Sequence, residues 1–271
     1  MNFTKTTFFT FCLVFLVAAC GYYKFTPITQ NAPQSLNQLV DTDSTAVDFF
    51  SMESTPVLNE IDLEAFDNAS ELLEQKETIV IDPGHGGYDP GKVGTSKNYE
   101  KDINLKIALK LKTFLEEHKY NTVLTRLEDK DLDSYPDKFH KKEDMHARSK
   151  IINEFPAAAL VSIHQNAFAQ EKVKGAQVFY YNDQSPGKML ASFVKDSIKE
   201  HADPDNSRPI KASQEYYLLK TSKIPGIIVE CGFLTNKEEE KKLLSDEYQT
   251  KMAQAIGFGI IKFLESTSTT S

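Results

Sequence analysis

The stretch Thr78-Ile79-Val80-Ile81-Asp82-Pro83-Gly84-His85 begins a region in which strand patterns alternate with helix patterns. Its first four residues are β-branched, which favours a β-strand, and Asp82-Pro83-Gly84 is a turn sequence that ends the strand. Apolar residues then recur every four positions over 102–118. This spacing places them on one face of a helix, so the stretch predicts a strand followed by an amphipathic helix.

The same alternation continues to residue 265. We expect further strands at 122–125, 158–163, 176–181, 216–220 and 226–229, and further helices at 143–154, from Ser185-Pro186 onward, at 236–245 and at 246–265. Strands interleaved with helices are typical of α/β proteins. The sequence therefore predicts a three-layer α/β/α sandwich around a mainly parallel sheet of about six strands, formed by residues 78–265. The Ser/Thr-rich residues 266–271 are expected to be a disordered tail.

The N-terminus has the features of an export signal. Lys5 precedes an apolar stretch at 8–17 that is too short to span a bilayer but fits the apolar part of a signal peptide. Small residues then lead directly to Cys20, as in the lipobox of bacterial lipoproteins. We expect residues 1–19 to be a lipoprotein signal peptide and a lipidated Cys20 to anchor the exported protein to the cell membrane, facing the cell wall. The alternatives are an ordinary signal peptide with an incidental cysteine, or an uncleaved anchor.

The formal net charge of −8 is concentrated ahead of the α/β region. Residues 41–77 hold eleven acidic residues and one basic residue, whereas 28 basic residues balance 28 acidic ones from Thr78 onward. The polar composition of 20–57 predicts an acidic disordered tether. Apolar spacing predicts an amphipathic helix at 58–75, within a linker that ends at residue 77; this helix either packs on the domain or shields its active site. The basic patch of a nucleic-acid-binding protein is missing from the sequence, so nucleic acid is excluded as a partner.

The cysteines exclude an intramolecular disulfide in the mature protein. Cys12 would leave with the signal peptide and Cys20 would carry lipid, so that Cys231 alone remains. An exported domain without disulfides must be held by its core, by a metal ion, or by both. Cys231 follows an apolar strand and is expected to be a packed small residue, not a nucleophile.

Three of the expected strands lead to a residue that a hydrophobic core disfavours. The strand at 78–81 leads to His85, the strand at 158–163 to His164, and the strand at 226–229 to Glu230. Ligands of α/β sheets bind beyond the carboxyl ends of the strands. A single histidine is more often structural, but three such residues at strand ends predict one shared site.

The residue types indicate a zinc site. Catalytic zinc takes three protein ligands from His, Glu or Asp and leaves a position for water. His85 and His164 are the nitrogen ligands, and the third is one of Glu100, Asp82, Asp89 and Glu230. Spacing alone does not choose between Glu100, which lies just ahead of the first helix, and Asp89. The sequence has neither a phosphate-binding glycine loop nor a His-Glu-x-x-His helix.

Five ordered segments resemble the catalytic domain of the zinc-dependent N-acetylmuramoyl-L-alanine amidases. They are Ile79-Val80-Ile81-Asp82-Pro83-Gly84-His85-Gly86-Gly87, Tyr99-Glu100-Lys101-Asp102-Ile103-Asn104-Leu105, Val123-Leu124-Thr125-Arg126, Val161-Ser162-Ile163-His164-Gln165-Asn166-Ala167 and Gly226-Ile227-Ile228-Val229-Glu230-Cys231-Gly232-Phe233-Leu234. The resemblance implies that His85, Glu100 and His164 bind one zinc ion and that Glu230 is the general base. It also implies hydrolysis of the amide bond between N-acetylmuramic acid and L-alanine in peptidoglycan.

Segments 126–132, 175–181 and 217–220 further resemble the sporulation amidases of endospore-forming bacteria, which act on spore cortex. The lipobox and the long acidic tether depart from those proteins. Arg148 and Asn166 are second-tier candidates for substrate contact or loop support, and for Arg148 the structural role is favoured. A regulatory protein partner is not identified by the sequence. The alternative functions are a catalytically silent, lipid-anchored peptidoglycan-binding protein and a zinc peptidase of the stem peptide.

Overall fold

The computed structural model describes residues 76–133, 135 and 140–268. The chain divides into Met1–Val57 and Leu58–Ser271, and every described residue belongs to the second unit. The expected signal peptide, the tether at 20–57 with Cys20, and the helix at 58–75 lie outside the described residues, as do residues 269–271. Within the described part of the chain, no helix is both long enough and apolar enough to cross a membrane.

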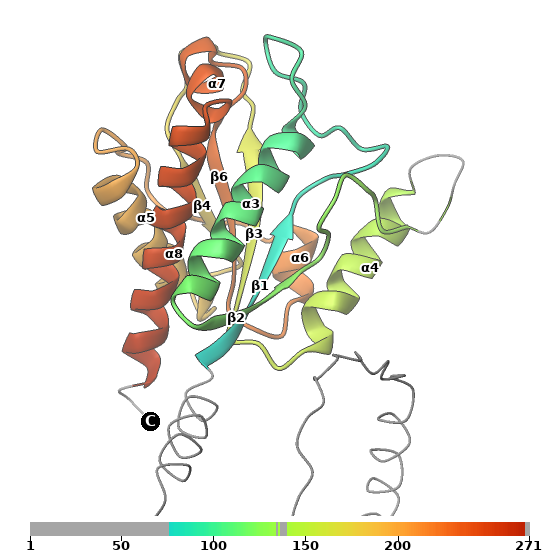
Figure 1. Ribbon diagram of the computed structural model, residues 1–271, viewed down its shortest axis with the longest axis vertical. Coiled ribbons are helices and arrows are strands. Elements are labelled where there is room, and N and C mark those ends of the chain that lie inside the picture. The colour runs from blue at the N-terminus through green and yellow to red at the C-terminus, as the bar shows by residue number, and fades with distance from the viewer. Residues whose placement is uncertain (1–75, 134, 136–139, 269–271) are drawn as a thin grey trace, which may run out of the picture. The chain divides into compact units, whose positions relative to one another are not determined.

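Six strands form one mixed sheet in the order β2-β1-β3-β6-β4-β5; Figure 1 labels each of them except β5. They are β1 (Lys76–Pro83), β2 (Tyr120–Leu124), β3 (Ala159–Asn166), β4 (Gln177–Tyr180), β5 (Lys211–Ala212) and β6 (Gly226–Phe233). β1 pairs in parallel with β2 and β3, and β3 pairs in parallel with β6, whereas β4 runs antiparallel to β6. The predicted mainly parallel sheet is confirmed.

Helices cover both faces of this sheet. They are α3 (Glu100–Glu117), α4 (Lys141–Glu154), α5 (Gly187–His201), α6 (Tyr217–Thr221), α7 (Lys237–Leu243) and α8 (Asp246–Ser268). On one face α8 lies between α3 and α5 (Figure 1). α4 and α6 pack against the other face, so the predicted three-layer arrangement is confirmed.

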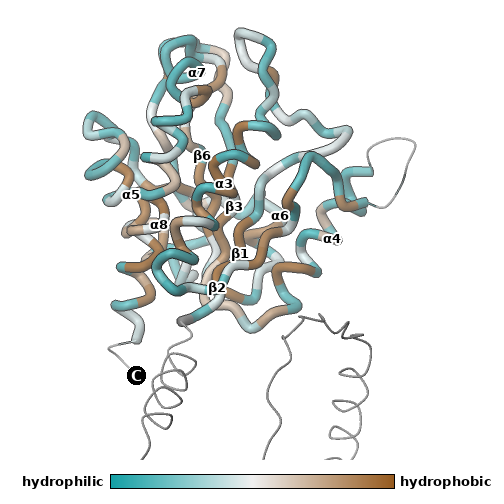
Figure 2. Tube along the Cα trace, in the orientation of Figure 1, coloured by the Kyte–Doolittle hydropathy of each residue, from teal (hydrophilic) through white to brown (hydrophobic). Residues whose placement is uncertain are grey.

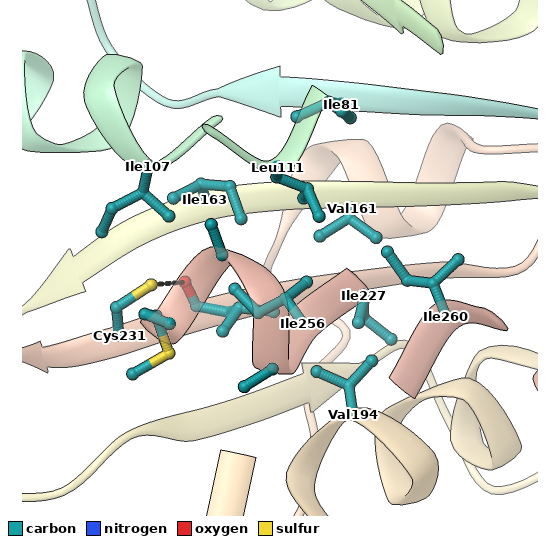
Figure 3. Close-up of a cluster of buried hydrophobic side chains, with 14 of the residues drawn as sticks. Ile81, Ile107, Leu111, Val161, Ile163, Val194, Ile227, Cys231, Ile256 and Ile260 are labelled. Carbon is teal, nitrogen blue, oxygen red and sulfur yellow. Dashed lines mark hydrogen bonds between the residues drawn. The ribbon is translucent and has the colours of Figure 1, made fainter. Parts of the chain in front are cut away.

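Alternating strand residues supply the cores of the two faces, as expected from the two-residue period of a strand. Ile79 and Ile81 of β1 belong to the large cluster that also contains residues of α3, α5 and α8, part of which is drawn in Figure 3. Val80, between them, packs with Ile152 of α4 and Leu218 of α6. Figure 2 shows hydrophobic residues concentrated along the strands and the helix faces that cover them.

The strand predicted at 216–220 is wrong, because residues 217–221 form the short helix α6. The Ser222 N–H donates to the Leu218 carbonyl, closing a helical turn. The neighbouring residues Leu218 and Leu219 pack into different core clusters. Because both are apolar, the segment has the apolar composition of a buried strand. A short apolar run does not distinguish a strand from a buried turn of helix. The sixth strand is instead β5, whose two residues are exposed and carry no apolar pattern.

Several element boundaries also differ from the expected ones, and two of these differences move the limits of the predicted domain. β1 begins at Lys76 and so includes the last two residues of the predicted linker. α8 continues to Ser268, three residues into the predicted tail. In this last turn the hydroxyl groups of Ser266 and Ser268 donate to the carbonyls of Phe263 and Leu264, at 2.6 and 3.0 Å.

Gly259 lies where α8 crosses α5, and we expect Gly259→Ala to destabilise the protein. An added Cβ would lie 2.5 Å from the Val194 Cα, a backbone atom that cannot rotate away. The clash should lower the free energy of unfolding by roughly 1–3 kcal/mol, although alanine is the better helix former. Urea unfolding measures this change. Gln254→Ala, on the exposed side of the same helix, is the control; equal stability of the two variants would contradict the tight crossing.

Candidate active site

His85, Glu100 and His164 come together at the carboxyl ends of β1 and β3. The Nε2 atom of His85 lies 3.2 Å from Oε2 of Glu100, and Nδ1 of His164 lies 3.0 Å from Oε1 of the same carboxylate. One ligand atom from each residue lies within 4.8 Å of the other two. The site thus offers two imidazole nitrogens and one carboxylate around a common point, a set of donors that suits a metal ion.

Glu100 is held as a buried anion at the start of α3. Its Oε1 atom accepts a hydrogen bond of 3.0 Å from the Gln165 N–H, and its Oε2 atom accepts one of 2.8 Å from the Lys92 N–H. Burial alone raises the pKa of the Glu100 carboxyl, but the hydrogen bonds with His164 and His85 outweigh burial and hold the pKa well below its usual range. The negative charge of the site is therefore fixed near neutral pH.

His85 is oriented by Asp89. The His85 backbone has a left-handed φ of 62°, and its Nδ1 atom lies 2.6 Å from Oδ2 of Asp89. This contact leaves Nε2 directed at Glu100. Burial lowers the pKa of His85, but the hydrogen bonds to Asp89 and Glu100 outweigh it and raise the pKa to about 9. Asp89, an alternative third ligand by spacing, instead lies behind a candidate ligand, where metal-binding histidines commonly have a carboxylate partner.

Asp82, another alternative ligand, is fully buried and engaged elsewhere. Its Oδ1 atom accepts from Arg148 Nη1 at 2.8 Å and from the Thr125 hydroxyl at 2.6 Å, and its Oδ2 atom accepts from the Ser162 hydroxyl at 2.6 Å. Burial raises the pKa of Asp82, but the Arg148 charge and these hydrogen bonds outweigh it and lower the pKa to about 2.

Two buried guanidinium groups hold the turn that carries His85. Arg148 donates to the carbonyls of Pro83 and His85, at 2.9 and 2.7 Å. Arg126 donates to the carbonyls of Pro83 and Gly84, both at 3.0 Å. Arg148 therefore occupies the position of a structural residue beneath the site, and Arg126 has a matching position that the sequence pattern did not indicate.

Two glycines let the backbone approach the candidate ligands. A Cβ on Gly84 would lie 2.2 Å from Cε1 of His164, and a Cβ on Gly91 would lie 2.6 Å from Oε2 of Glu100. Both distances are far below a van der Waals contact. A larger residue at either position would displace a ring or carboxylate of the site.

Glu230 lies on β6, beside the three candidate ligands. It is the residue that pairs with His164 on the neighbouring strand β3. Its Oε1 atom accepts a hydrogen bond of 3.3 Å from the Tyr216 hydroxyl, whereas its buried Oε2 atom has no hydrogen-bond partner among the described residues. Burial raises the pKa of the Glu230 carboxyl, the Glu100 charge adds to this effect, and His164 opposes it. A buried carboxyl with a raised pKa is suited to accept and return a proton.

A cavity of about 260 Å³ opens beside His85 and His164, between α4 and α6. Its walls include Met145, Tyr216 and Leu218. Sequence reasoning missed Tyr216 because the segment was read as a strand, and no motif marks its hydroxyl group as a partner of Glu230.

Asn166 and Cys231 have local roles in the structure. The Asn166 side-chain carbonyl accepts from the Ala167 N–H at 2.8 Å, and its backbone carbonyl accepts from the Leu234 N–H at 2.9 Å. These contacts tie the end of β3 to the segment after β6. Cys231 is fully buried in the cluster of Figure 3, and burial raises the pKa of its thiol, as expected of a packed residue.

Residues 79–262 match the family model described as N-acetylmuramoyl-L-alanine amidase, a range that contains His85, Glu100, His164 and Glu230. The germination-specific N-acetylmuramoyl-L-alanine amidase of Bacillus subtilis is 36% identical over 188 residues, which cover 68% of this chain and 78% of that protein.

Two solved structures are also similar. The CwlD amidase from Clostridioides difficile, in complex with the GerS lipoprotein, matches with a TM-score of 0.67 and 40% identity over 70% of this chain and 100% of that one. The N-acetylmuramoyl-L-alanine amidase from Clostridium difficile 630 matches with a TM-score of 0.64 and 32% identity over 71% of this chain and 99% of that one.

Asp82 should make stability depend on pH in the acid range. Its pKa is about 2 in the folded protein, against an ordinary value of 3.8. A carboxyl with a lowered folded pKa stabilises the protein above its unfolded pKa, and this contribution is lost as the pH falls through the folded value. We expect the Asp82 contribution, about 2 kcal/mol, to disappear between about pH 4 and pH 2. The free energy of unfolding of Asp82→Asn, measured with urea, should therefore fall less steeply over this pH range than that of the unaltered protein. The exposed control Asp102→Asn should behave like the unaltered protein. An equally steep fall in Asp82→Asn would contradict the assignment.

Proposed function

Because the chain is an enzyme of the N-acetylmuramoyl-L-alanine amidase family, which acts on peptidoglycan, we propose that it hydrolyses the bond between N-acetylmuramic acid and L-alanine with one zinc ion. The observation that carries the proposal is the convergence of His85, Glu100 and His164 on one point, with the Glu230 carboxylate beside them. By this proposal the first three residues are the metal ligands and Glu230 is the general base.

The donor set fits zinc. Two imidazoles and one carboxylate are a known ligand combination of catalytic zinc, and three protein ligands leave a coordination position for water or substrate. The Asp89 carboxylate behind His85 supports the assignment, because it fixes the ring so that Nε2 faces the other two ligands. When bound, zinc lowers the pKa of water and polarises a carbonyl group, which is the chemistry that amide hydrolysis needs.

Glu230 supplies the proton transfer. Its Oε2 atom accepts a proton from the attacking water, and the protonated carboxyl then donates it to the departing L-alanine nitrogen. The Tyr216 hydroxyl orients the carboxylate through Oε1, which leaves Oε2 for the reaction. The raised pKa of Glu230 supports this double role, because the carboxyl must hold the proton between the two steps.

The chain outside the described residues completes the proposal. Residues 1–19 would be the signal peptide, a lipidated Cys20 the membrane anchor, 20–57 the tether and 58–75 a helix, ahead of the catalytic domain that begins with β1. The enzyme would then act outside the cytoplasm, at the membrane face of the cell wall. The germination-specific relative supports a role in spore cortex, and the lipoprotein in the CwlD complex supports a regulatory protein partner.

Digestion of purified wall tests the reaction. The full chain in detergent should release L-alanine amino termini from sacculi while leaving the glycan intact, as measured by mass spectrometry. His164→Ala should lose both bound zinc and activity. Glu230→Gln should retain zinc but lose about 10²- to 10⁴-fold in rate, because the metal site survives without its proton carrier. Glu238→Gln, at an exposed position of α7, is the matched carboxylate control and should keep both properties.

The outcomes separate the alternatives. Activity that survives both chelation and His164→Ala would contradict the metal assignment. New ends between stem amino acids would favour a peptidase, and no new ends from any wall would favour a silent binding protein. Digestion of spore cortex in preference to vegetative wall would support the cortex role, and the reverse preference would contradict it.

Cys20→Ala should abolish attachment of lipid. The thiol is the attachment point for the acyl group, and each buried CH₂ of that group contributes about 0.8 kcal/mol to membrane binding. Incorporation of a labelled fatty acid in a bacterial host should fall to background, and the protein should leave the membrane fraction. Cys12→Ala, within the predicted signal peptide, is the control and should still be labelled at Cys20. Labelling of Cys20→Ala at the level of the unaltered chain would contradict the proposed anchor.

A further inference from the structure

We propose that the cavity between α4 and α6 receives the first residues of the peptidoglycan stem peptide and that Lys141 binds the carboxylate carried by the second of them. This inference rests on the proposed function, because it assigns one side of the substrate at the same site.

The cavity begins at the candidate metal ligands. His85 and His164 both line it, Met145 of α4 and Leu218 of α6 contribute to its walls, and Ile228 of β6 lies at the sheet. Its volume is about 260 Å³. A substrate whose scissile amide lies at the two histidines therefore has one of its halves beside this cavity.

The position of Glu230 indicates which half of the substrate lies beside the cavity. Tyr216 lines the cavity, and its hydroxyl group lies 3.3 Å from Oε1 of Glu230. Glu230 is the residue proposed to return a proton to the departing nitrogen, so the amine side of the scissile bond must face it. The cavity therefore lies on the side of the stem peptide. Its apolar wall residues match the methyl group of L-alanine and the methylene groups of the residue that follows.

The charge of the substrate also supports placing the stem peptide, and not the sugar, at the cavity. The lactyl carboxyl of muramic acid is consumed in the scissile amide, so the sugar half is neutral at this point. The stem peptide, in contrast, carries a free α-carboxylate on the D-glutamate that follows L-alanine, because the chain continues through the side-chain carboxyl of that residue. A cation beside the cavity would therefore select the peptide half.

Lys141 is the cation that suits this role. It is the first residue of α4, lines the cavity and is exposed, and it forms no ion pair with any of the described residues. Arg148, the other basic residue of the cavity lining, is already held by Asp82 and Asp144 at 2.8 and 2.7 Å. Glu215 on the α6 side disfavours a carboxylate there and so directs the carboxylate toward α4.

The test uses two muramoyl tripeptides that differ at one group. One carries D-glutamate at the second position and the other D-isoglutamine, in which the α-carboxylate is an amide. Values of kcat and KM are measured for the full chain, for Lys141→Gln and for Lys142→Gln. Lys142 is the matched control, because it is an exposed neighbour on α4 that does not line the cavity.

We expect the unaltered chain to prefer the glutamate substrate about threefold to fivefold in kcat/KM, the range of an exposed ion pair. Lys141→Gln should lose this preference through a higher KM for the glutamate substrate, and Lys142→Gln should keep both the preference and the rates of the unaltered chain. Added salt should weaken the preference of the unaltered chain, because it screens exposed charges.

Two results would overturn the inference. One is a preference for glutamate that survives in Lys141→Gln, and the other is an equal loss of rate on both substrates in that variant. If the unaltered chain releases no L-alanine amino terminus from either substrate, the proposed function itself fails, which is a different result from cleavage without a carboxylate preference.

Discussion

The carboxylate of Glu100 is the group on which the candidate site depends. Its two oxygens face the imidazoles of His85, which follows β1, and of His164, which lies near the end of β3, and backbone N–H groups of Gln165 and Lys92 donate to it as well. Burying an unpaired carboxylate costs several kcal/mol, so such a group persists in a fold only where donors surround it. Here they do, and the charge and shape of the site are set by the protein itself before a ligand arrives.

The positions of the two histidines depend in turn on the end of β1. His85 adopts a left-handed backbone conformation, which costs roughly 1–2 kcal/mol for a residue with a Cβ. Arg148 and Arg126 offset this cost by holding the carbonyl groups of residues 83–85. Asp82, a buried residue of β1, forms an ion pair with Arg148, and this pair links the sheet core to the orientation of His85. Site geometry and fold stability are therefore coupled through a few buried charges.

Much of this arrangement could be predicted from local sequence patterns. His85, His164 and Glu230 each follow or end an apolar strand, and parallel strands bring such residues to one edge of a sheet. Glu100 could not be placed in this way, because the path of residues 86–99 back to the strand ends has no local period; its assignment came from family resemblance. Tyr216 was not predicted as a site residue, because the apolar residues Leu218 and Leu219 made the segment beside it resemble a strand and not the short helix α6. The clamp formed by Arg126 and Arg148 joins residues distant in sequence, and no local spacing encodes it.

Anomalous diffraction at the zinc edge tests the central claim most directly. Crystals of the full chain grown with zinc should show a peak bounded by His85, Glu100 and His164, with ligand atoms at about 2.0–2.2 Å from the metal. The Asp89 carboxylate should remain on the far nitrogen of His85. A peak held by Asp89 or Asp82 with Glu100 turned away, or no peak at this position, would contradict the account.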